Sequence, residues 1–262
     1  MIEQGIQSLL KVLRKLDRPP AGPNWVRFIF DDPVRTAKAI LAFAKGQPRF
    51  NYQVGYRAIK DRIELGISLE TALLVVSRKG APTGREQNRE LVEAFFEYDR
   101  VRRYSASNPV GFDTEYFRVS REVLVPVAPL SIIRENGSFV PIFACGWTEN
   151  PLTPIQRRLL ATIQEDAFLS LTDFQKSRAE VLFFPKVSTG EGQSRKPEIW
   201  HRGDYALLSK SELDGCVENF VLAREMARGV LLDEIENLRG SAQEAEAGSQ
   251  GAMVGPLLFD KE

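Results

Sequence analysis

The chain has 262 residues, 43% of them hydrophobic and 27% charged, which is the balance of an ordinary folded globular protein. Its 35 Lys and Arg side chains match 35 Asp and Glu side chains, so no overall positive field would draw the molecule to nucleic acid or anionic lipid. No stretch approaches the roughly 18 uninterrupted apolar residues of a transmembrane helix. Cys145 and Cys216 lie far apart in apolar surroundings and are expected to be reduced core thiols. We therefore expect a soluble, cytoplasmic protein.

Residues 1–105 are expected to be mainly helical. Apolar residues from Ile2 to Leu16 recur at helical spacing and predict an amphipathic helix, which packs on the body of the protein or on a second copy of the chain. A breaker cluster follows at 19–24, and WVRFIF at 25–30 predicts a short strand. Further helices are expected over 33–45, capped by Asp32, over about 52–65, over 69–79, capped by Ser68, and over 85–104.

A basic cluster of Arg100, Arg102 and Arg103 ends the fourth of these helices. Cations at this position interact favourably with the negative end of the helix dipole, which is a structural role that needs no binding partner. The segment DRIELGISLETALLVV has a glycine between two helical stretches, as helix-turn-helix modules do, but its second helix offers few side chains that read base edges. An ordinary helical hairpin is the favoured interpretation, and contact with nucleic acid stays open.

After the first 105 residues the pattern changes from helical periodicity to alternation. Apolar residues at odd positions from Phe117 to Val127 predict a strand, with a bulge or break near Arg121. PLSIIRENGSFVPIFACGW predicts a β-hairpin, because Asn136 followed by Gly137 suits a type I′ turn. The second strand of this hairpin is apolar on both faces and is expected at the centre of the sheet, with Pro141 at a bulge or an unpaired position.

The next segments alternate between helix and strand. Thr153 and Gln156 have the spacing of a capping box and predict a helix that crosses the sheet. AEVLFFP at 179–185 predicts a strand, and the Gly, Ser and charge-rich segment 187–197 predicts a loop. A last long helix is expected to start near Ser209.

The predicted fold class is α+β, with a helical N-terminal half followed by a mixed sheet that contains at least one β-hairpin and is packed by helices. The chain divides into a helical region at 1–105, a sheet region at 106–239 and a flexible tail at 240–262. The side chains of the tail are too small and polar to bury the apolar surface that an ordered structure requires. The first two regions could form one continuous domain.

The order of elements after residue 80 resembles the PD-(D/E)XK nuclease-like architecture over about half of the chain. Those enzymes place an acidic residue on one strand and an acid-x-Lys triplet on the next, where the carboxylates hold a divalent metal. The corresponding strand here, FVPIFACGW, contains neither a carboxylate nor a lysine, and Glu135 and Glu149 only flank it. The resemblance therefore implies at most a degenerate nuclease-like core.

Known site motifs are absent from the sequence, so no cofactor and no metal is predicted. One histidine and two separated cysteines provide no zinc ligand pairs. VSTGEGQSRKP lacks the G-x-x-x-x-G-K-[ST] spacing of a phosphate loop, and the chain contains no G-x-S-x-G elbow.

His201, Arg202 and Asp204 form the candidate polar site, in PEIWHRGDY. A catalytic histidine needs an orienting carboxylate and a nucleophile close in space, which sequence neighbours do not supply. We interpret the segment as a strand that runs into a turn, in which Gly203 allows the turn and Asp204 accepts a backbone hydrogen bond or caps the helix.

Leu257, Leu258 and Phe259 are candidate contact residues, because they are large and apolar and follow a segment of flexible composition. Two classes of function remain. The favoured one is a non-catalytic intracellular protein that acts through protein contacts, as a homodimer or with another protein, since no recognisable site motif is present. The alternative is a nucleic-acid-processing enzyme or factor with a degenerate nuclease-like core.

Overall fold

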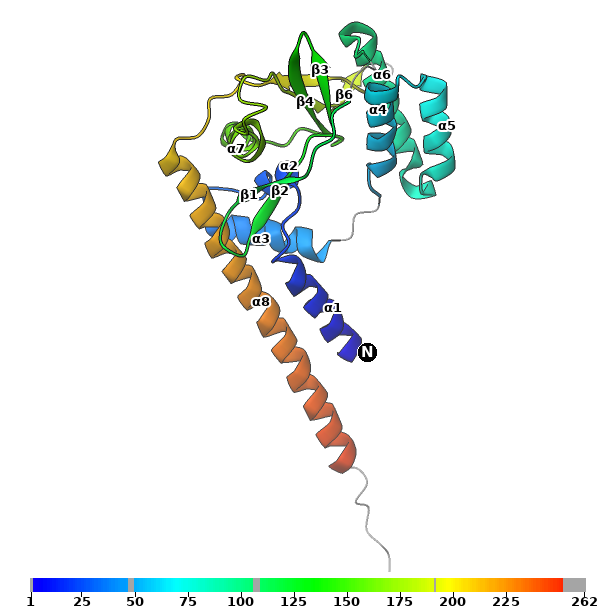
Figure 1. The fold of residues 1–262 in the computed structure, drawn as a ribbon. Helices are drawn as coiled ribbons and strands as arrows, with labels where there is room; N and C mark the ends of the chain where they lie inside the picture. The colour runs from blue at the N-terminus through cyan, green and yellow to red at the C-terminus, as the bar shows by residue number, and fades with distance from the viewer. Residues whose placement is uncertain (1, 47–49, 106–108, 191, 252–262) are drawn as a thin grey trace, which may run out of the picture. The chain divides into compact units, whose positions relative to one another are not determined.

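A computed structural model describes residues 2–46, 50–105, 109–190 and 192–251, traced in Figure 1. The chain forms two compact units. The first consists of Met1–Arg18, Phe30–Gly46 and Glu218–Glu262, and the second of Pro19–Ile29 and Gln47–Val217. Helices together with mixed sheets of several strands confirm the predicted α+β class.

The first unit is built from α1 (Ile2–Lys15), α3 (Pro33–Lys45) and the larger part of α8 (Lys210–Gly251). The Asp32 carboxylate accepts the backbone N–H of Val34 at 2.8 Å, which confirms the predicted cap of α3. Apolar side chains form the interior of this unit: Ile6, Val12, Ile40, Ala44, Leu231 and Ile235.

α8 extends to Gly251, so residues 240–251 of the predicted tail are helical. The segment SAQEAEA is rich in Ala, Glu and Gln, which have high helix propensity. A helix also satisfies most of its backbone hydrogen bonds within its own segment and so does not depend on a core for them. Helical backbone at 240–251 is therefore compatible with a tail that has no core of its own.

The second unit starts with a helix where a strand was predicted. The first two residues of WVRFIF end α2 (Gly22–Val26). The next residues form turns, in which the backbone N–H groups of Phe28 and Ile29 donate to the carbonyls of Trp25 and Val26. Pro23 favours this conformation, because its fixed φ is compatible with the first turn of a helix. Trp25, Val26 and Ile29 are buried, so the apolar run fills the core as a helix and turn.

Three helices follow in this unit: α4 (Gln53–Leu65), α5 (Leu69–Lys79) and α6 (Arg85–Arg102), with a short 3₁₀ turn η1 (Pro82–Gly84) before the last. Gly66 ends α4 in the left-handed region, with φ of 69°. The Ser68 hydroxyl accepts the backbone N–H of Thr71 at 3.2 Å, which confirms the predicted cap of α5.

The main sheet has four strands in the order β3 (Ser131–Glu135), β4 (Ser138–Cys145), β5 (Glu180–Phe183) and β8 (Glu198–His201). β3 is antiparallel to β4, β4 is parallel to β5, and β5 is antiparallel to β8. Asn136 and Gly137 join β3 and β4 with φ of 49° and 80°, as a type I′ turn requires. The predicted hairpin and the central position of its second strand are confirmed.

Pro141 lacks a backbone N–H, and the sheet requires no hydrogen bond from this position. The Ile142 carbonyl accepts the backbone N–H of Leu130, so Ile142 faces the β3 side and its neighbour Pro141 faces the β5 side. Pairing with β5 begins only at Ile142 and Glu180. Pro141 therefore needs no N–H group, although it stands opposite Ile132 in the β3–β4 ladder and not at the predicted bulge or unpaired position.

Helices cover both faces of this sheet, as Figure 1 shows. Ile133, Ile142 and Leu182 pack against α4, α5 and α6 in one core cluster. On the other face lie α7 (Pro154–Gln164) and η2 (Glu165–Leu169), where Phe143 contacts Phe168 with ring centroids 6.0 Å apart. α4 to α6 thus share one core cluster with the sheet.

Two small hairpins complete the second unit. β1 (Glu115–Arg118) and β2 (Leu124–Val127) pair across a turn, at the break predicted near Arg121. β6 (Lys186–Thr189) and β7 (Gly192–Arg195) pair within the segment predicted to be a loop. Local composition missed this second hairpin because its anchor, described below, is a contact with distant residues.

Candidate functional site

A cavity of about 240 Å³ lies in the second unit, between the end of α7 and the turn after β8. Most of its walls are apolar or aromatic, and its polar groups come from a few positions. Its lining includes Ala161, Gln164, Glu165, Leu169, Trp200, His201, Arg202, Tyr205 and Leu207.

One wall of the cavity is a π-helix, η2, which continues α7 without a break. The backbone N–H of Ser170 donates to the Glu165 carbonyl at 2.8 Å, five residues back instead of four. Such widened turns are rare and are frequent at functional sites. The π-helix begins directly after Gln164 and contributes Glu165 and Leu169 to the cavity wall.

Arg202 and Glu165 hold the π-helix to the turn after β8. Arg202 Nε donates to Glu165 Oε2 at 2.9 Å, and a second guanidinium nitrogen donates to the other carboxylate oxygen. Arg202 Nη1 also donates to the carbonyls of Phe174 and Ser177, both at 2.8 Å. The charges of the pair satisfy each other, so Arg202 acts as a structural clamp at the cavity.

His201 and Asp204 form the turn. The backbone N–H of His201 donates to Asp204 Oδ2 at 2.7 Å, and Gly203 adopts φ of 99°. The imidazole is 61% exposed, with Nδ1 3.7 Å from Asp204 Oδ2. Within the described part of the chain, no hydroxyl or thiol is hydrogen-bonded to this imidazole. The geometry is that of a strand running into a turn.

Two aromatic rings form a fixed corner of the cavity. Trp200 and Tyr205 meet edge to face, with ring centroids 4.6 Å apart, and Trp200 also packs on Phe183 at 4.4 Å. The Tyr205 hydroxyl accepts from Arg157 Nη1 at 3.3 Å, and Trp200 Nε1 donates to Glu198 at 3.0 Å. Both rings are therefore held in place before any ligand binds.

The rim of the cavity is tied to α7 as well. Arg158 donates to the backbone carbonyls of Ala206 and Leu207 at 3.2 and 3.1 Å, and the backbone N–H of Leu208 donates to Thr162 Oγ1 at 2.8 Å. Leu207 itself stays 48% exposed at the opening. The rim thus presents an apolar side chain on a fixed backbone.

Gln164, the last residue of α7, forms part of the wall of this cavity. Its side chain lines the cavity and is only 4% exposed, yet its Nε2 has no hydrogen-bond partner. Less than 1 Å² of this nitrogen is accessible, so it is sealed within the wall and does not face the cavity. Sequence reasoning missed Gln164, because nothing in its neighbourhood distinguishes it from the other helix residues.

A second, more polar cavity of about 440 Å³ lies between the end of α6 and the start of α5. Arg62, Arg100 and Arg103 line it together with Asp99. Arg62 Nε donates to Asp99 Oδ2 at 2.7 Å. Arg100 and Arg103 have no acidic partner among the described residues, so this cavity carries two uncompensated positive charges.

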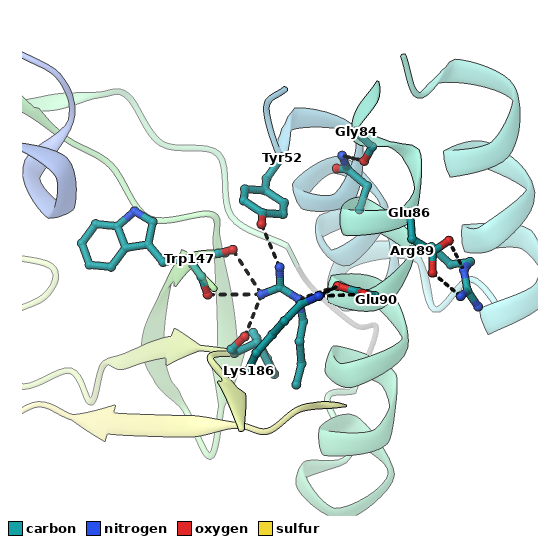
Figure 2. A network of polar contacts seen from close by, with 11 residues as sticks. Tyr52, Gly84, Glu86, Arg89, Glu90, Trp147 and Lys186 are labelled. Atoms are coloured by element: carbon teal, nitrogen blue, oxygen red, sulfur yellow. Dashed lines mark hydrogen bonds and ion pairs between the residues drawn. The ribbon is translucent and has the colours of Figure 1, made fainter. Parts of the chain in front are cut away.

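Arg195 is the centre of a third polar cluster, and Figure 2 shows its neighbours Tyr52, Glu90 and Trp147 from close by. Its side chain is 1% exposed, and its Nη1 donates to the carbonyls of Phe184 at 2.7 Å and of Gly146 and Trp147 at 3.2 Å. Its Nη2 donates to the Tyr52 hydroxyl at 2.8 Å. Arg195 therefore anchors the β6–β7 hairpin to the sheet, which is a structural role.

The acidic residues that flank β4 are engaged as well. Glu135 accepts two hydrogen bonds from Arg102, at 3.0 and 2.8 Å, while buried Glu180 accepts from Arg102 Nε at 2.7 Å and from the Tyr104 hydroxyl. Burial raises the pKa of neighbouring Tyr98 to about 12. Within the described ranges, no group of three or more His, Cys, Asp and Glu side chains is placed to hold a metal ion.

The candidate contact residues Leu257, Leu258 and Phe259 lie outside the described residues. Of the helices in the described ranges, none is long and apolar enough to cross a membrane. Comparison with known proteins identifies no matching protein family, no matching curated protein and no matching solved structure.

Proposed function

We propose that the protein is non-catalytic and acts through contacts with a protein partner, and that the cavity between η2 and β8 receives a side chain of that partner. The observation that carries this proposal is an apolar and aromatic cavity whose rim residue, Leu207, is 48% exposed. Binding energy at protein interfaces concentrates in pockets of this kind, which bury one large anchor side chain. The charged pair at the cavity, Arg202 and Glu165, is already satisfied internally.

The size of the cavity supports an anchor side chain over a separate metabolite. At about 240 Å³ it lies below the roughly 300 to 1,000 Å³ of most small-molecule sites. Its rigid frame of Arg158, Arg202 and Trp200 lowers the entropy that is lost when a partner binds.

We place this activity in the cytoplasm. Cys145 and Cys216 are free thiols, and Cys145 is buried. Burial raises the pKa of each thiol above its ordinary value. Free thiols of this kind are typical of a reducing compartment.

The proposal is tested by a photo-crosslinking side chain at Leu207 in the native cell, in the full chain. We expect one protein to be crosslinked, and we expect Ala161→Phe, which fills the cavity, to lower its yield at least about tenfold. Ala206→Phe is the matched control, because Ala206 is exposed and does not line the cavity. Equal yields from the two variants would overturn the proposal, and a second copy of the chain as the crosslinked protein would identify a homodimer.

One observation favours a second candidate, contact with nucleic acid by a factor that has a degenerate nuclease-like core. Arg100 and Arg103 line the larger cavity without acidic partners, and arginines commonly pair with phosphate. This candidate predicts salt-dependent DNA binding that these two residues supply, and its test is given in the Discussion.

A further inference from the structure

The larger cavity, between the end of α6 and the start of α5, has a charge and a lining that the proposed protein contact does not use. We infer that this cavity binds the terminal phosphoryl group of a phosphate monoester, with Arg100 and Arg103 as the residues that pair with the phosphate. The inference depends on the charge balance of the cavity, on the backbone at Arg103 and on an apolar wall beside the arginines.

The other two charged groups at this cavity, Arg62 and Asp99, neutralise each other. Arg62 Nε donates to Asp99 Oδ2 at 2.7 Å, and Asp99 Oδ1 accepts the backbone N–H of Tyr104 at 2.8 Å. Both carboxylate oxygens are thus engaged, and the Asp99 side chain is only 3% exposed. Arg100 and Arg103 are exposed and form no ion pair within the described ranges. The lining therefore presents two positive charges to a ligand.

Two positive charges suit a phosphate monoester better than a phosphodiester. A monoester carries a charge of about −1.5 to −2 near pH 7, whereas a phosphate within a nucleic-acid strand carries only one negative charge. Guanidinium groups pair with phosphate oxygens through charge-assisted hydrogen bonds. The first residue of α5, Leu69, also lines the cavity, and its backbone N–H has no acceptor within the helix, so the helix start adds a neutral donor.

Arg103 has a backbone conformation that suits glycine better than arginine. It ends α6 with φ of 57°, in the left-handed region, where glycine is the usual residue. Gly66 occupies the corresponding position at the end of α4, with φ of 69°. The backbone therefore gives no reason for a side chain at position 103, and a guanidinium that pairs with an anion gives one.

The remaining wall suits the organic group of the ester. Ile67, Leu69 and Phe96 line the cavity beside the two arginines. The volume of about 440 Å³ lies within the roughly 300 to 1,000 Å³ of small-molecule sites, so it leaves room for more than the phosphoryl group. A free phosphorylated small molecule and the 5′ end of a nucleic acid both present this chemistry.

The experiment compares phenyl phosphate, a monoester, with methyl phenyl phosphate, a diester that has the same ring and one negative charge. The full chain is titrated with each at about pH 7.5, where the monoester is mainly dianionic. Binding is followed by the amide NMR shifts of residues 66–70 and 99–104. We expect phenyl phosphate to bind at least about tenfold more tightly, because only the monoester has a charge for each arginine. Equal affinities, or no binding of phenyl phosphate, would overturn the inference.

Arg103→Gly separates binding from folding. Glycine suits the left-handed backbone, so we expect the melting temperature to stay equal or rise while the affinity for phenyl phosphate falls at least about tenfold. Arg100→Gln should lower the affinity by a similar factor. Arg78→Gln on α5 is the matched control, because it removes an exposed positive charge outside the cavity. An unchanged affinity in Arg103→Gly, or equal losses in Arg100→Gln and Arg78→Gln, would also overturn the inference.

A trinucleotide with a 5′-phosphate, compared with the same trinucleotide ending in a 5′-hydroxyl, identifies the source of the phosphoryl group. If the phosphorylated form alone binds at least as tightly as phenyl phosphate, the ligand is the end of a nucleic acid. If it binds more weakly, the ligand is a small molecule, and the monoester inference stands in both cases. The crosslinking comparison of Ala161→Phe with Ala206→Phe tests the protein contact at the smaller cavity, so either idea can fail without the other.

Discussion

The Arg195 guanidinium supplies hydrogen bonds that no other described group provides to the same carbonyls. Replacing it by methionine keeps the apolar stem but leaves the carbonyls of Phe184, Gly146 and Trp147 without this donor. We expect Arg195→Met to lower the free energy of unfolding by about 3 kcal/mol or more, measured by chemical denaturation.

The matched control is Arg89→Met on α6. Arg89 pairs with Glu86 and Glu93, as Figure 2 shows for the first of these, but its side chain is 48% exposed. Exposed pairs typically contribute about 0 to 1 kcal/mol. Similar losses in the two variants would contradict the anchoring role of Arg195.

Single residues also mark the limit of what the sequence could predict. Arg195 lies in a polar, loop-like segment, and Gln164 lies in an ordinary amphipathic helix. The neighbours of each residue in the sequence give no sign that it is buried. Both acquire their environment from residues distant in the chain. The turn at His201 was predictable, because Gly203 and Asp204 act on the adjacent backbone.

At the scale of the element, the start of α7 is a capping box. The backbone N–H of Gln156 donates to Thr153 Oγ1 at 3.4 Å, and the backbone N–H of Thr153 donates to Gln156 Oε1 at 3.0 Å. We expect Thr153→Ala to lower stability by about 0.5 to 2 kcal/mol, measured as a shift in the denaturation midpoint. Thr153→Ser retains the hydroxyl acceptor and should lose much less. An unchanged midpoint for Thr153→Ala would contradict the cap.

The start of α8 predicts a dependence on pH. Hydrogen bonds from Arg158 and from Ser209 lower the pKa of Glu212 from 4.5 to about 2. Because the folded pKa is the lower one, this contribution to stability is complete above about pH 4.5 and is lost as the pH falls toward 2. We expect the difference in melting temperature between wild type and Glu212→Gln to be constant above pH 4.5 and to shrink below it.

Glu218→Gln is the control for this pH series. The Glu218 carboxylate lies on the same helix, is exposed and has no ion pair among the described residues. A difference for Glu212→Gln that stays constant down to pH 2 would contradict the effect of Arg158.

Elements whose signals are local could be predicted from the sequence. The Asn136–Gly137 turn and the caps at Asp32, Ser68 and Thr153 depend on residues within a few positions of one another. WVRFIF was assigned to a strand because a short apolar run fits either a buried strand or a buried helix segment. Sheet order and the β6–β7 hairpin depend on contacts that no local pattern records.

For the whole molecule, the equal numbers of acidic and basic side chains predict weak DNA binding that salt weakens further. If the second candidate function holds, Arg100→Ala with Arg103→Ala should reduce duplex binding and lower the salt slope by about 2, measured by fluorescence anisotropy. Arg78→Ala with Lys79→Ala removes the same charge outside that cavity. Equal losses of DNA affinity in both double variants would exclude a specific role for the cavity. Sequence-selective DNA binding at about 200 mM salt would contradict the prediction that binding is weak.

The parallel pairing of β4 with β5 sets an order on folding. β3 and β4 are neighbours in sequence, and a hairpin of this kind forms in about 1 to 10 μs. β5 can pair only after the chain has closed across residues 146–179, and β8 pairs only with β5. The cavity takes its walls from α7, η2 and the turn after β8, so it exists only when both of these long-range pairings have formed. A partner that binds there would therefore distinguish chains whose second unit has folded from chains in which it has not.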